Sequence, residues 1–546
     1  MRTRLLSGTG RELVADVVIV GGGLGGCAAA LAAVEGGATV LLSEPTAWIG
    51  GQLTTQSVPP DEHGWIEHFG CTRSYRRLRN EFREYYRRHY PLAPSARRNP
   101  YLNPGNGWVS PLCHEPRVAL AVLEALLAPA RSAGRLNLLL RHELEGVDLA
   151  RTDSLGAITL RDLDSGDART VHGRFFLDAT ELGDLVERSG AESVTGTESG
   201  RDTGEPSAPS DGRPDNAQAF TMCCVVDHHD GEHHVIDRPD SYAFWREHVP
   251  ALTPPWSGPL ISWTAIHPRT LEPVTYRFAP NRERAVPFEG LWSYRRILDR
   301  AQFEPQAFTS DLCVLNWVML DYCLGDLVTA QKDERTRHVA AARELTRSVV
   351  YWLQTEAPRP DGGVGWPGLR LRGDVTGSDD GLALAPYIRE SRRIRALFTI
   401  CEQHVAAACR PGSTLAESFP DSIGIGSYRI DLHPSTGGDN YIDVPALPFQ
   451  IPLRALVPIR MGNLLPAAKN IGTTHITNGC YRLHPVEWNI GEVAGALAAH
   501  CVVRGRAPHD VAEHDHLLAE FQRHLVDRGV ELAWPADLVL AEGDPH

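Results

Sequence analysis

The chain of 546 residues lacks the features of several large protein classes. It has no apolar run of about 18 residues, the length that a helix needs to cross a bilayer. Its first residues also lack the apolar core of a secretory signal, so we expect a cytoplasmic protein. Basic residues are not in excess, because 54 Lys and Arg face 68 Asp and Glu, a formal net charge of −14. This balance argues against a nucleic-acid partner or an anionic membrane surface.

The cysteines lack the spacing of a metal or redox centre. There are eleven of them, and no two form a C-x-x-C or C-x4-C pair. This spacing argues against a zinc ribbon, an iron–sulfur cluster or a dithiol centre, and we predict no metal site. The adjacent pair Cys223 and Cys224 lies in the apolar run AFTMCCVV, where we expect packing rather than redox chemistry.

What the sequence does contain is a glycine cluster between two apolar runs. DVVIV, residues 16–20, has the β-branched composition of a central parallel strand. Gly21, Gly23 and Gly26 follow in the pattern G-x-G-x-x-G, and a helical run of small residues comes next. A second apolar run ends on Glu44, eighteen residues after the last of these glycines. The pattern predicts a dinucleotide site, with phosphates at the helix N-terminus and the acid at the ribose hydroxyls.

The next segment distinguishes between cofactors. PTAWIGGQLTTQ carries a second glycine pair, followed by glutamine and leucine. Together with the first motif it resembles the glutathione-reductase-type FAD-dependent oxidoreductases, and most closely a subgroup with a GGQ loop. In that family the loop runs beside the ribityl chain and pyrophosphate of FAD. The resemblance implies FAD as the cofactor, held by Gly21, Gly23, Leu24, Gly25, Gly26, Glu44, Gly50, Gly51, Gln52 and Leu53.

A second block, GRFFLDATELGDL, resembles the family's strand that ends in a D-A-T-x-x-G-D turn. In the family this turn approaches the nucleotide from the side opposite the glycine turn. The residues before it alternate apolar and polar side chains, as a β-meander does, and in the family the first of those strands lies near adenine. The resemblance implies cofactor contacts at the backbone of His142 or Glu143 and at Ala179, Thr180, Gly183 and Asp184.

A third block, residues 451–500, resembles the closing segment of the family. We expect a strand at residues 463–467 that returns to the nucleotide sheet, and a helix that starts near Asn489. In the family the N-terminus of this helix faces the pyrimidine carbonyl of the flavin, where its partial positive charge stabilises the reduced ring. The backbone N–H groups of Asn489 and Ile490 are the expected contacts.

These blocks predict an α/β protein with a discontinuous Rossmann-type FAD-binding domain and a mixed α+β substrate or cap domain. We place the first part of the FAD-binding domain at residues 1–215, the cap at 216–380, and the C-terminal part, which closes over the flavin, at 381–546. The first boundary follows a stretch rich in Pro, Gly, Ser and charge. The tryptophans of the cap suit a wall over a flavin and a plain core equally well.

Two arginine-rich segments each have two interpretations. Nine arginines lie between residues 73 and 98, and we favour a solvated helix face paired with Glu81 and Glu84 over a site for an anionic substrate. YIRESRRI, residues 387–394, alternates like a strand and recurs in the family. Arg389 and Arg393 within it are either substrate ligands or parts of structural salt bridges.

Flavin chemistry needs a substrate held against the ring, often with a base for the accompanying proton. Histidine titrates near neutral pH, and we expect the base among His63, His475 and His484, which follow the GGQ loop or precede the closing helix. Tyr481 and Arg389 are expected substrate contacts.

The predicted function is an FAD-dependent oxidase or dehydrogenase that removes a hydride from a C–N, C–O or C–C bond of a small metabolite in specialised biosynthesis. O2 or another acceptor would re-oxidise the flavin. The alternatives are an NADPH-dependent flavin monooxygenase and a flavin-binding structural protein. A pyridine-nucleotide–disulfide reductase is disfavoured, because the sequence has no redox cysteine pair.

Overall fold

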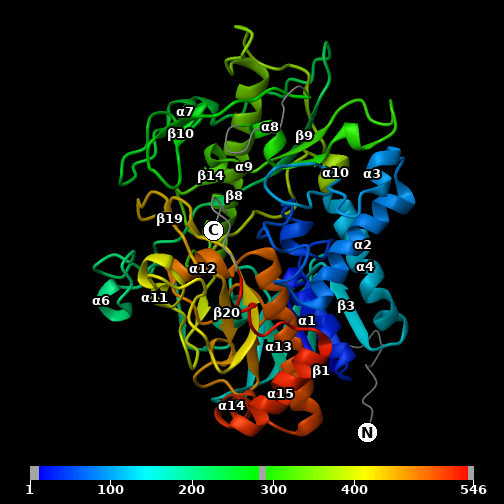
Figure 1. Ribbon diagram of the computed structural model, residues 1–546, viewed down its shortest axis with the longest axis vertical. Helices are drawn as coiled ribbons and strands as arrows, with labels where there is room; N and C mark the ends of the chain where they lie inside the picture. The colour runs from blue at the N-terminus through cyan, green and yellow to red at the C-terminus, as the bar shows by residue number, and fades with distance from the viewer. Residues whose placement is uncertain (1–11, 282–289, 539–546) are drawn as a thin grey trace.

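The computed structural model describes residues 12–281 and 290–538. The N-terminal and C-terminal parts of the chain share one lobe, and the middle of the chain forms a second lobe above it (Figure 1). We call these the nucleotide lobe and the cap lobe. The boundaries given above at residues 215 and 380 stay a prediction.

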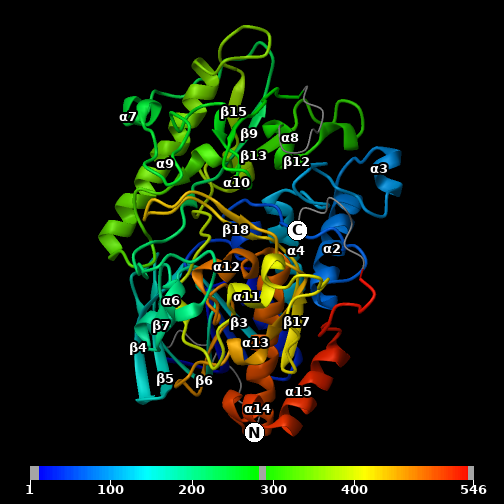
Figure 2. The same cartoon turned by 60° about the vertical axis from the view of Figure 1, so that its left-hand side comes forward.

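The nucleotide lobe is built on a seven-stranded sheet with the order β3-β2-β1-β6-β5-β4, and a seventh strand, β21, pairs with β6. The first four strands and β21 are parallel, whereas β6, β5 and β4 form an antiparallel meander at the side of the lobe (Figure 2). The expected Rossmann-type sheet and meander are therefore confirmed. The strands are β1 (Glu12–Val20), β2 (Val40–Glu44), β3 (Leu136–Leu140), β4 (His142–Arg151), β5 (Ser154–Asp162), β6 (Ala168–Asp178) and β21 (Leu464–Pro466).

Two helices from opposite ends of the chain pack on one face of this sheet, α1 (Leu24–Glu35) and α13 (His484–Arg504). A methyl group added at Gly491 would overlap the carbonyl oxygen of Gly25, and one at Gly495 would overlap that of Ala29. The two helices therefore touch backbone to backbone, an approach that requires glycine at both α13 positions.

The helix α13 begins at His484, five residues earlier than expected. Leu483 is its N-cap and Pro485 lies in the first turn, where a missing N–H group costs no hydrogen bond. The expectation that the helix starts near Asn489 is wrong. Asn489 and Ile490 lie in the second turn, so their N–H groups point along the helix to earlier carbonyls rather than out of its N-terminus.

The arginine-rich helix α2 (Arg73–His89) matches the prediction only in part. Its exposed face carries the expected pairs with Glu84 and Glu81, at 2.6 Å from Arg87 and 3.1 Å from Arg88. Arg79 and Arg83 are instead buried and bond to Glu62 and Glu67 of the preceding loop, so they hold that loop against the helix.

The predicted strand at residues 387–394 is also mostly absent. Only Arg393 and Ile394 pair as β16, with β7 (Ser193–Val194). Arg393 is fully buried, 2.6 Å from Glu390 and 2.9 Å from Glu198. Of its two interpretations, the structure supports the salt-bridged one.

The cap lobe contains a four-stranded antiparallel sheet of β12, β13, β9 and β15, covered by the long helix α9 (Lys332–Thr355). Its strands are β9 (Cys224–His228), β12 (Arg296–Leu298), β13 (Leu312–Leu315) and β15 (Leu369–Leu371). Cys223 and Cys224 are buried in this core, and burial raises the pKa of Cys223 to about 12, so the expected packing role is confirmed. Most cap tryptophans are buried in the same core, among them Trp245, Trp292, Trp317, Trp352 and Trp366.

Further elements connect the two lobes. Short strand pairs lie between them, with β8 next to β14 and β18 next to β19, while β17 and β20 form a pair within the nucleotide lobe. Their bounds are β8 (Phe220–Thr221), β14 (Asp321–Tyr322), β17 (Ser422–Gly426), β18 (Ile430–Leu432), β19 (Ile442–Val444) and β20 (Phe449–Pro452). The remaining longer helices are α4 (Pro116–Ser132), α5 (Asp184–Arg188), α12 (His475–Tyr481), α14 (Pro508–Glu513) and α15 (Asp515–Arg528).

Two kinds of feature are absent from residues 12–281 and 290–538. No helix there has both the length and the apolar character that a membrane crossing needs. No group of three or more His, Cys, Asp or Glu side chains there is arranged to hold a metal ion.

The contact between α1 and α13 gives a stability prediction. Gly495→Ala forces the added methyl group against the carbonyl oxygen of Ala29, and we expect a loss of about 1–3 kcal/mol in unfolding free energy. Gly146→Ala is the matched control, because its methyl group would lie 3.8 Å from Thr159, at ordinary contact distance. Denaturant unfolding followed by circular dichroism measures both. Equal stability of the two variants would contradict the backbone contact.

Candidate active site

The chain turns sharply between β1 and α1. Gly21 has a φ of +99°, which residues with a side chain rarely adopt, and a methyl group there would overlap the carbonyl oxygen of Ala179. The N–H group of Gly22 donates to Oε2 of Glu44 at 2.9 Å. Glycine is therefore required by the turn itself, and the acid at the end of β2 lies directly beside it.

The GGQ segment lies on top of this turn. Gly50 donates its N–H to the carbonyl oxygen of Gly22 at 2.7 Å. A methyl group added at Gly51 would lie 2.9 Å from the Cα of Gly23 and 3.3 Å from the nitrogen of Leu24. Two glycine segments that are separate in sequence thus form one surface at the N-terminus of α1.

This surface presents unpaired donors. Among the described residues, none accepts a hydrogen bond from the backbone N–H groups of Gly23, Leu24, Gly51 and Gln52. The positive end of a helix with free N–H groups is suited to an anion such as a phosphate. The residues present therefore fit the pyrophosphate of a dinucleotide. The predicted neighbours Gly25, Gly26 and Leu53 are buried around this surface.

Glu44 is positioned by three hydrogen bonds. Besides Gly22, its carboxylate accepts the N–H group of Thr46 at 2.9 Å and the hydroxyl of Thr46 at 2.7 Å. Burial raises the pKa of Glu44 to about 7 in spite of these bonds. The acid thus lies at the place where the fold puts the ribose of a dinucleotide.

The DATELGD turn lies against the opposite side of the glycine turn. Asp178 accepts the N–H group and the hydroxyl of Thr180 at 2.9 and 2.7 Å, and the same hydroxyl accepts the N–H group of Asp184 at 2.7 Å. Gly183 has a φ of +73° and is the N-cap of α5. The turn is therefore held by its own side chains. Asp184 also pairs with Arg335 of α9 at 2.9 Å, which ties this turn to the cap lobe.

On β4, the first strand of the meander, the side chains of the predicted cofactor residues make other contacts. The carboxylate of Glu143 lies near the surface, 2.9 Å from the ammonium group of Lys332. The Nδ1 atom of His142 lies 2.7 Å from the carbonyl oxygen of Leu140. The predicted backbone contact near adenine stays a prediction.

Three charged side chains meet at the glycine surface. Glu487, in the first turn of α13, accepts the N–H group of Gly25 at 3.2 Å and bonds to the side-chain amide of Gln52. Glu181, of the DATELGD turn, pairs with the buried Lys469 that follows β21. Since these residues come from three distant segments, no local motif signals their meeting.

The three predicted catalytic histidines are buried and lie apart. His484 accepts the N–H group of Asp61 on Nδ1 at 3.0 Å, and burial lowers its pKa to about 3, too low for a base at neutral pH. His475 lies 2.9 Å from Glu390. The Nε2 atom of His63 lies 3.0 Å from the carbonyl oxygen of Gly70, and its ring packs edge-on against Trp534. The structure therefore argues against His484 as the base, whereas His63 and His475 stay predictions.

The two predicted substrate contacts differ in position. Tyr481 donates its hydroxyl to the carbonyl oxygen of Gln450 at 2.8 Å, and its ring stacks on Phe449 with centroids 4.2 Å apart, so it belongs to the core. Arg389 lies between the lobes, 3.1 Å from Asp321, and donates to the hydroxyl of Thr221 at 3.0 Å. Asn489 donates its side-chain amide to Ile423, away from the glycine surface.

A polar group of side chains surrounds Arg389 where the two lobes meet, and we call it the junction cluster. It contains three arginine–aspartate pairs, Arg295 with Asp61 at 3.1 Å, Arg389 with Asp321 at 3.1 Å, and Arg482 with Asp431 at 3.2 Å. Its other members are His433, Tyr294, Tyr387, Tyr428 and Tyr441. Both lobes contribute residues to the cluster. Asp321 begins β14, in the cap part of the chain, and Asp431 lies on β18, which packs on α12.

His433 is the histidine of this cluster, and it follows β18 directly. Its Nδ1 atom lies 2.6 Å from Asp321, and its Nε2 atom lies 3.8 Å from Asp431. Asp321 also accepts the hydroxyl of Thr221 at 2.7 Å. A carboxylate that holds Nδ1–H leaves Nε2 free to accept a proton, the arrangement of a general base. Its sequence neighbours carry no motif, so sequence analysis missed it.

The cluster contains hydrogen-bond donors that have no partner. The hydroxyl of Tyr441 and the Nε atoms of Arg295, Arg389 and Arg482 are buried without a hydrogen-bond partner. Burial raises the pKa of the Tyr428 hydroxyl well above the usual value, so this group stays protonated. Unpaired buried donors are costly unless a ligand or water satisfies them. The cluster is therefore suited to a polar ligand.

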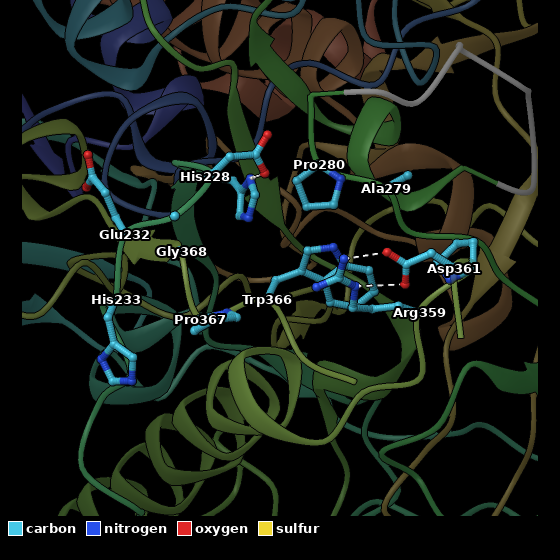
Figure 3. Close-up of a pocket in the computed structure, with 13 residues that line it drawn as sticks. His228, Glu232, His233, Ala279, Pro280, Arg359, Asp361, Trp366, Pro367 and Gly368 are labelled. Atoms are coloured by element: carbon cyan, nitrogen blue, oxygen red, sulfur yellow. Dashed lines mark hydrogen bonds and ion pairs between the residues drawn. The ribbon is translucent and has the colours of Figure 1, made fainter. Parts of the chain in front are cut away.

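A cavity of about 430 Å³ lies elsewhere, in the cap lobe. Figure 3 shows Trp366 and the ion pair of Arg359 with Asp361 on one side of it, and His228 with Gly368 on another. None of its lining residues belongs to the glycine surface or the junction cluster. It therefore plays no part in the arrangement described above.

Comparison with solved structures gives only partial matches. L-proline dehydrogenase from P. horikoshii is 15% identical, with 34% of this chain and 24% of that chain covered and a TM-score of 0.17. The rebeccamycin biosynthetic enzyme RebC with reduced flavin is 16% identical, with 39% and 38% covered and a TM-score of 0.22. 3-Ketosteroid-Δ4-(5α)-dehydrogenase from Rhodococcus jostii RHA1 is 16% identical, with 41% and 62% covered and a TM-score of 0.22. Each match spans less than two thirds of the other chain.

Comparison with curated proteins finds no match. Comparison with protein families matches residues 16–525 to the family described as FAD dependent oxidoreductase. That match includes both glycine segments, the DATELGD turn, the closing helix and most of the cap. On the strength of a family match over nearly the whole chain, and of two glycine segments that form one surface at the N-terminus of α1, the chain belongs to the FAD-dependent oxidoreductase family, and it is an enzyme that uses FAD.

Proposed function

We propose that this enzyme oxidises a small polar metabolite held in the junction cluster, by hydride removal from a C–N, C–O or C–C bond, as one step of a specialised biosynthesis. O2 or another acceptor then re-oxidises the flavin. The observation that supports this proposal best is the pair of Asp321 and His433, because it is a partly accessible histidine–carboxylate pair at the junction with the nucleotide lobe. A cluster of polar donors surrounds it.

FAD, when bound, supplies the acceptor for the hydride. The free N–H groups of Gly23, Leu24, Gly51 and Gln52 would hold its pyrophosphate, and Glu44 its adenosine ribose. These contacts account for the first two glycine segments of the sequence. They also leave the junction cluster free for the substrate; β18, which carries Asp431, lies on the cap side of α12 (Figure 2).

His433 takes the substrate proton on Nε2. Asp321 holds the Nδ1 proton, fixes the tautomer and stabilises the imidazolium that forms. Burial alone would raise the pKa of Asp321, but Arg389 and His433 lower it, so the group stays a carboxylate at neutral pH. Arg389 is therefore a positioning residue, because it keeps Asp321 charged. This role differs from the substrate contact that the sequence predicted for it.

The remaining members of the cluster orient the substrate and exclude water. Arg482 donates to the hydroxyl of Tyr387 at 3.1 Å and to Asp431, and keeps its Nε atom unpaired. Tyr441 keeps its hydroxyl unpaired. These donors suit oxygen or nitrogen atoms of a substrate, and the aromatic rings beside them suit its carbon skeleton.

A substrate screen tests the reaction class. Under argon, we expect one or more members of a panel of amines, alcohols and amino acids to bleach the flavin absorbance of the purified holoenzyme. Return of the colour in air with formation of hydrogen peroxide would identify an oxidase, and return only with an artificial acceptor a dehydrogenase. Bleaching by NADPH alone would contradict the proposal and favour the monooxygenase.

A single substitution tests the base. His433→Asn removes the proton acceptor, and we expect the rate of anaerobic flavin reduction by the substrate found in the screen to fall about 10²–10⁴-fold. The matched control is His234→Asn, since His234 also lies 2.6 Å from a carboxylate, that of Glu232, but outside the cluster. Both variants should keep the flavin spectrum of the parent. A rate unchanged in His433→Asn would remove this histidine from the mechanism.

A further inference from the structure

The glycine surface holds two acidic side chains of the chain itself. The Oε1 atom of Glu181 lies 3.1 Å from the position that a methyl group on Gly51 would take, and 3.4 Å from the corresponding position on Gly23. Glu487 accepts the N–H group of Gly25 at 3.2 Å. The pyrophosphate of FAD is itself an anion that seeks the same donors. A bound cofactor and these acids therefore compete for one surface.

The two acids differ in how firmly they are held. Glu487 is 1% exposed and is bonded to both glycine segments, through Gly25 and the amide of Gln52. Burial raises the pKa of Glu487, while its bonds from Gly25 and Gln52 lower it. The side chain of Glu181 is 24% exposed, and its ion pair is with Lys469. Glu181 can therefore leave toward solvent, whereas Glu487 belongs to the permanent structure.

Lys469 cannot leave in the same way. Its side chain is only 1% exposed, and it follows β21 at the end of the strand that enters the nucleotide sheet. Burial would lower its pKa, but Glu181 and Glu487 raise it, so the ammonium group is charged. A buried cation without a counter-ion strongly destabilises the fold, so another anion must replace any carboxylate that leaves it. An ammonium group with three donors is a common partner of phosphate.

We propose that Lys469 is a ligand of the FAD pyrophosphate, and that Glu181 is a displaceable stand-in for that phosphate. The carboxylate of Glu181 covers the front of Gly23 and Gly51 and neutralises Lys469 while the cofactor is absent. FAD binding replaces one anion by another, so the buried lysine is paired in both states. This inference rests on the FAD site and not on the role of His433.

Cofactor affinity in the two single variants tests the exchange. In apo-protein, the dissociation constant of FAD is measured by quenching of flavin fluorescence. Lys469→Gln should weaken binding about tenfold or more, because the phosphate loses a buried charged partner. Glu181→Gln should instead tighten binding severalfold, because the competing anion is gone. If the ion pair were only structural, loss of either partner would weaken FAD binding. Weaker binding in both variants would therefore overturn the proposal.

Controls at the surface show whether loss of charge alone has an effect. Lys332→Gln removes an exposed ammonium group, and Glu81→Gln removes a carboxylate that pairs with Arg88 on the outside of α2. Both should leave the FAD dissociation constant unchanged. An effect in the controls equal to that in Lys469→Gln and Glu181→Gln would assign the result to net charge and overturn the proposal.

Two ligand fragments locate the contact on the cofactor. ADP and adenosine are each used to compete with FAD for the apo-protein. Lys469→Gln should weaken ADP about as much as FAD and leave adenosine unchanged, because adenosine carries no phosphate. Equal weakening of both fragments would place the lysine at the nucleoside and overturn the proposal.

A double variant keeps the test valid if Lys469→Gln folds poorly. Lys469→Gln with Glu181→Gln removes both charges and leaves no unpaired buried ion. Its apo-protein should melt close to the parent, and its ADP affinity should stay below that of Glu181→Gln alone. Equal ADP affinity in these two would show that Lys469 does not bind phosphate. His433→Asn should bind FAD as the parent does, so failure of this proposal is separate from failure of the proposed reaction.

Discussion

The contact between the backbones of α1 and α13 is the constraint on which the site depends. Gly491 and Gly495 let the closing helix lie against Gly25 and Ala29. This approach brings Glu487 within hydrogen-bonding distance of the glycine turn. It also fixes Arg482, just before the helix, beside the junction cluster. A bulkier residue at either glycine would therefore move the glycine surface and the junction cluster together.

The two lobes are joined by ion pairs as well as by a shared apolar cluster, in which Val58 and Tyr441 pack with cap residues. Asp184 pairs with Arg335, and two pairs of the junction cluster, Arg295 with Asp61 and Arg389 with Asp321, also join the cap to the rest of the chain. Buried ion pairs of this kind contribute little net stability, but a missing partner is strongly destabilising. They therefore select one arrangement of the lobes, and the substrate side is defined by that arrangement.

Sequence motifs predicted the nucleotide side because their signal is local. The turn at Gly21 to Gly26, the acid Glu44 and the small-residue helix occupy consecutive residues, and each has a conformational reason that any chain must obey. Asp321, His433 and Arg482 meet only in the folded chain, so no window of sequence contains them together. The position of a residue near a motif does not predict where its side chain points. His63, His475 and His484 lie near the motifs, but their side chains are buried.

The strand β21 has a consequence for how the protein is made. This strand pairs with β6 inside the seven-stranded sheet of the nucleotide lobe, and α13 covers that sheet. Both elements come from residues 464–504, although the rest of the sheet comes from the first 178 residues. During synthesis the N-terminal half leaves the ribosome long before these partners exist, with residues 176–178 of β6 unpaired on one edge and the face of α1 uncovered. The nucleotide lobe can complete its core only when nearly the whole chain has been translated, so its folding is governed by the slowest, most distant contacts.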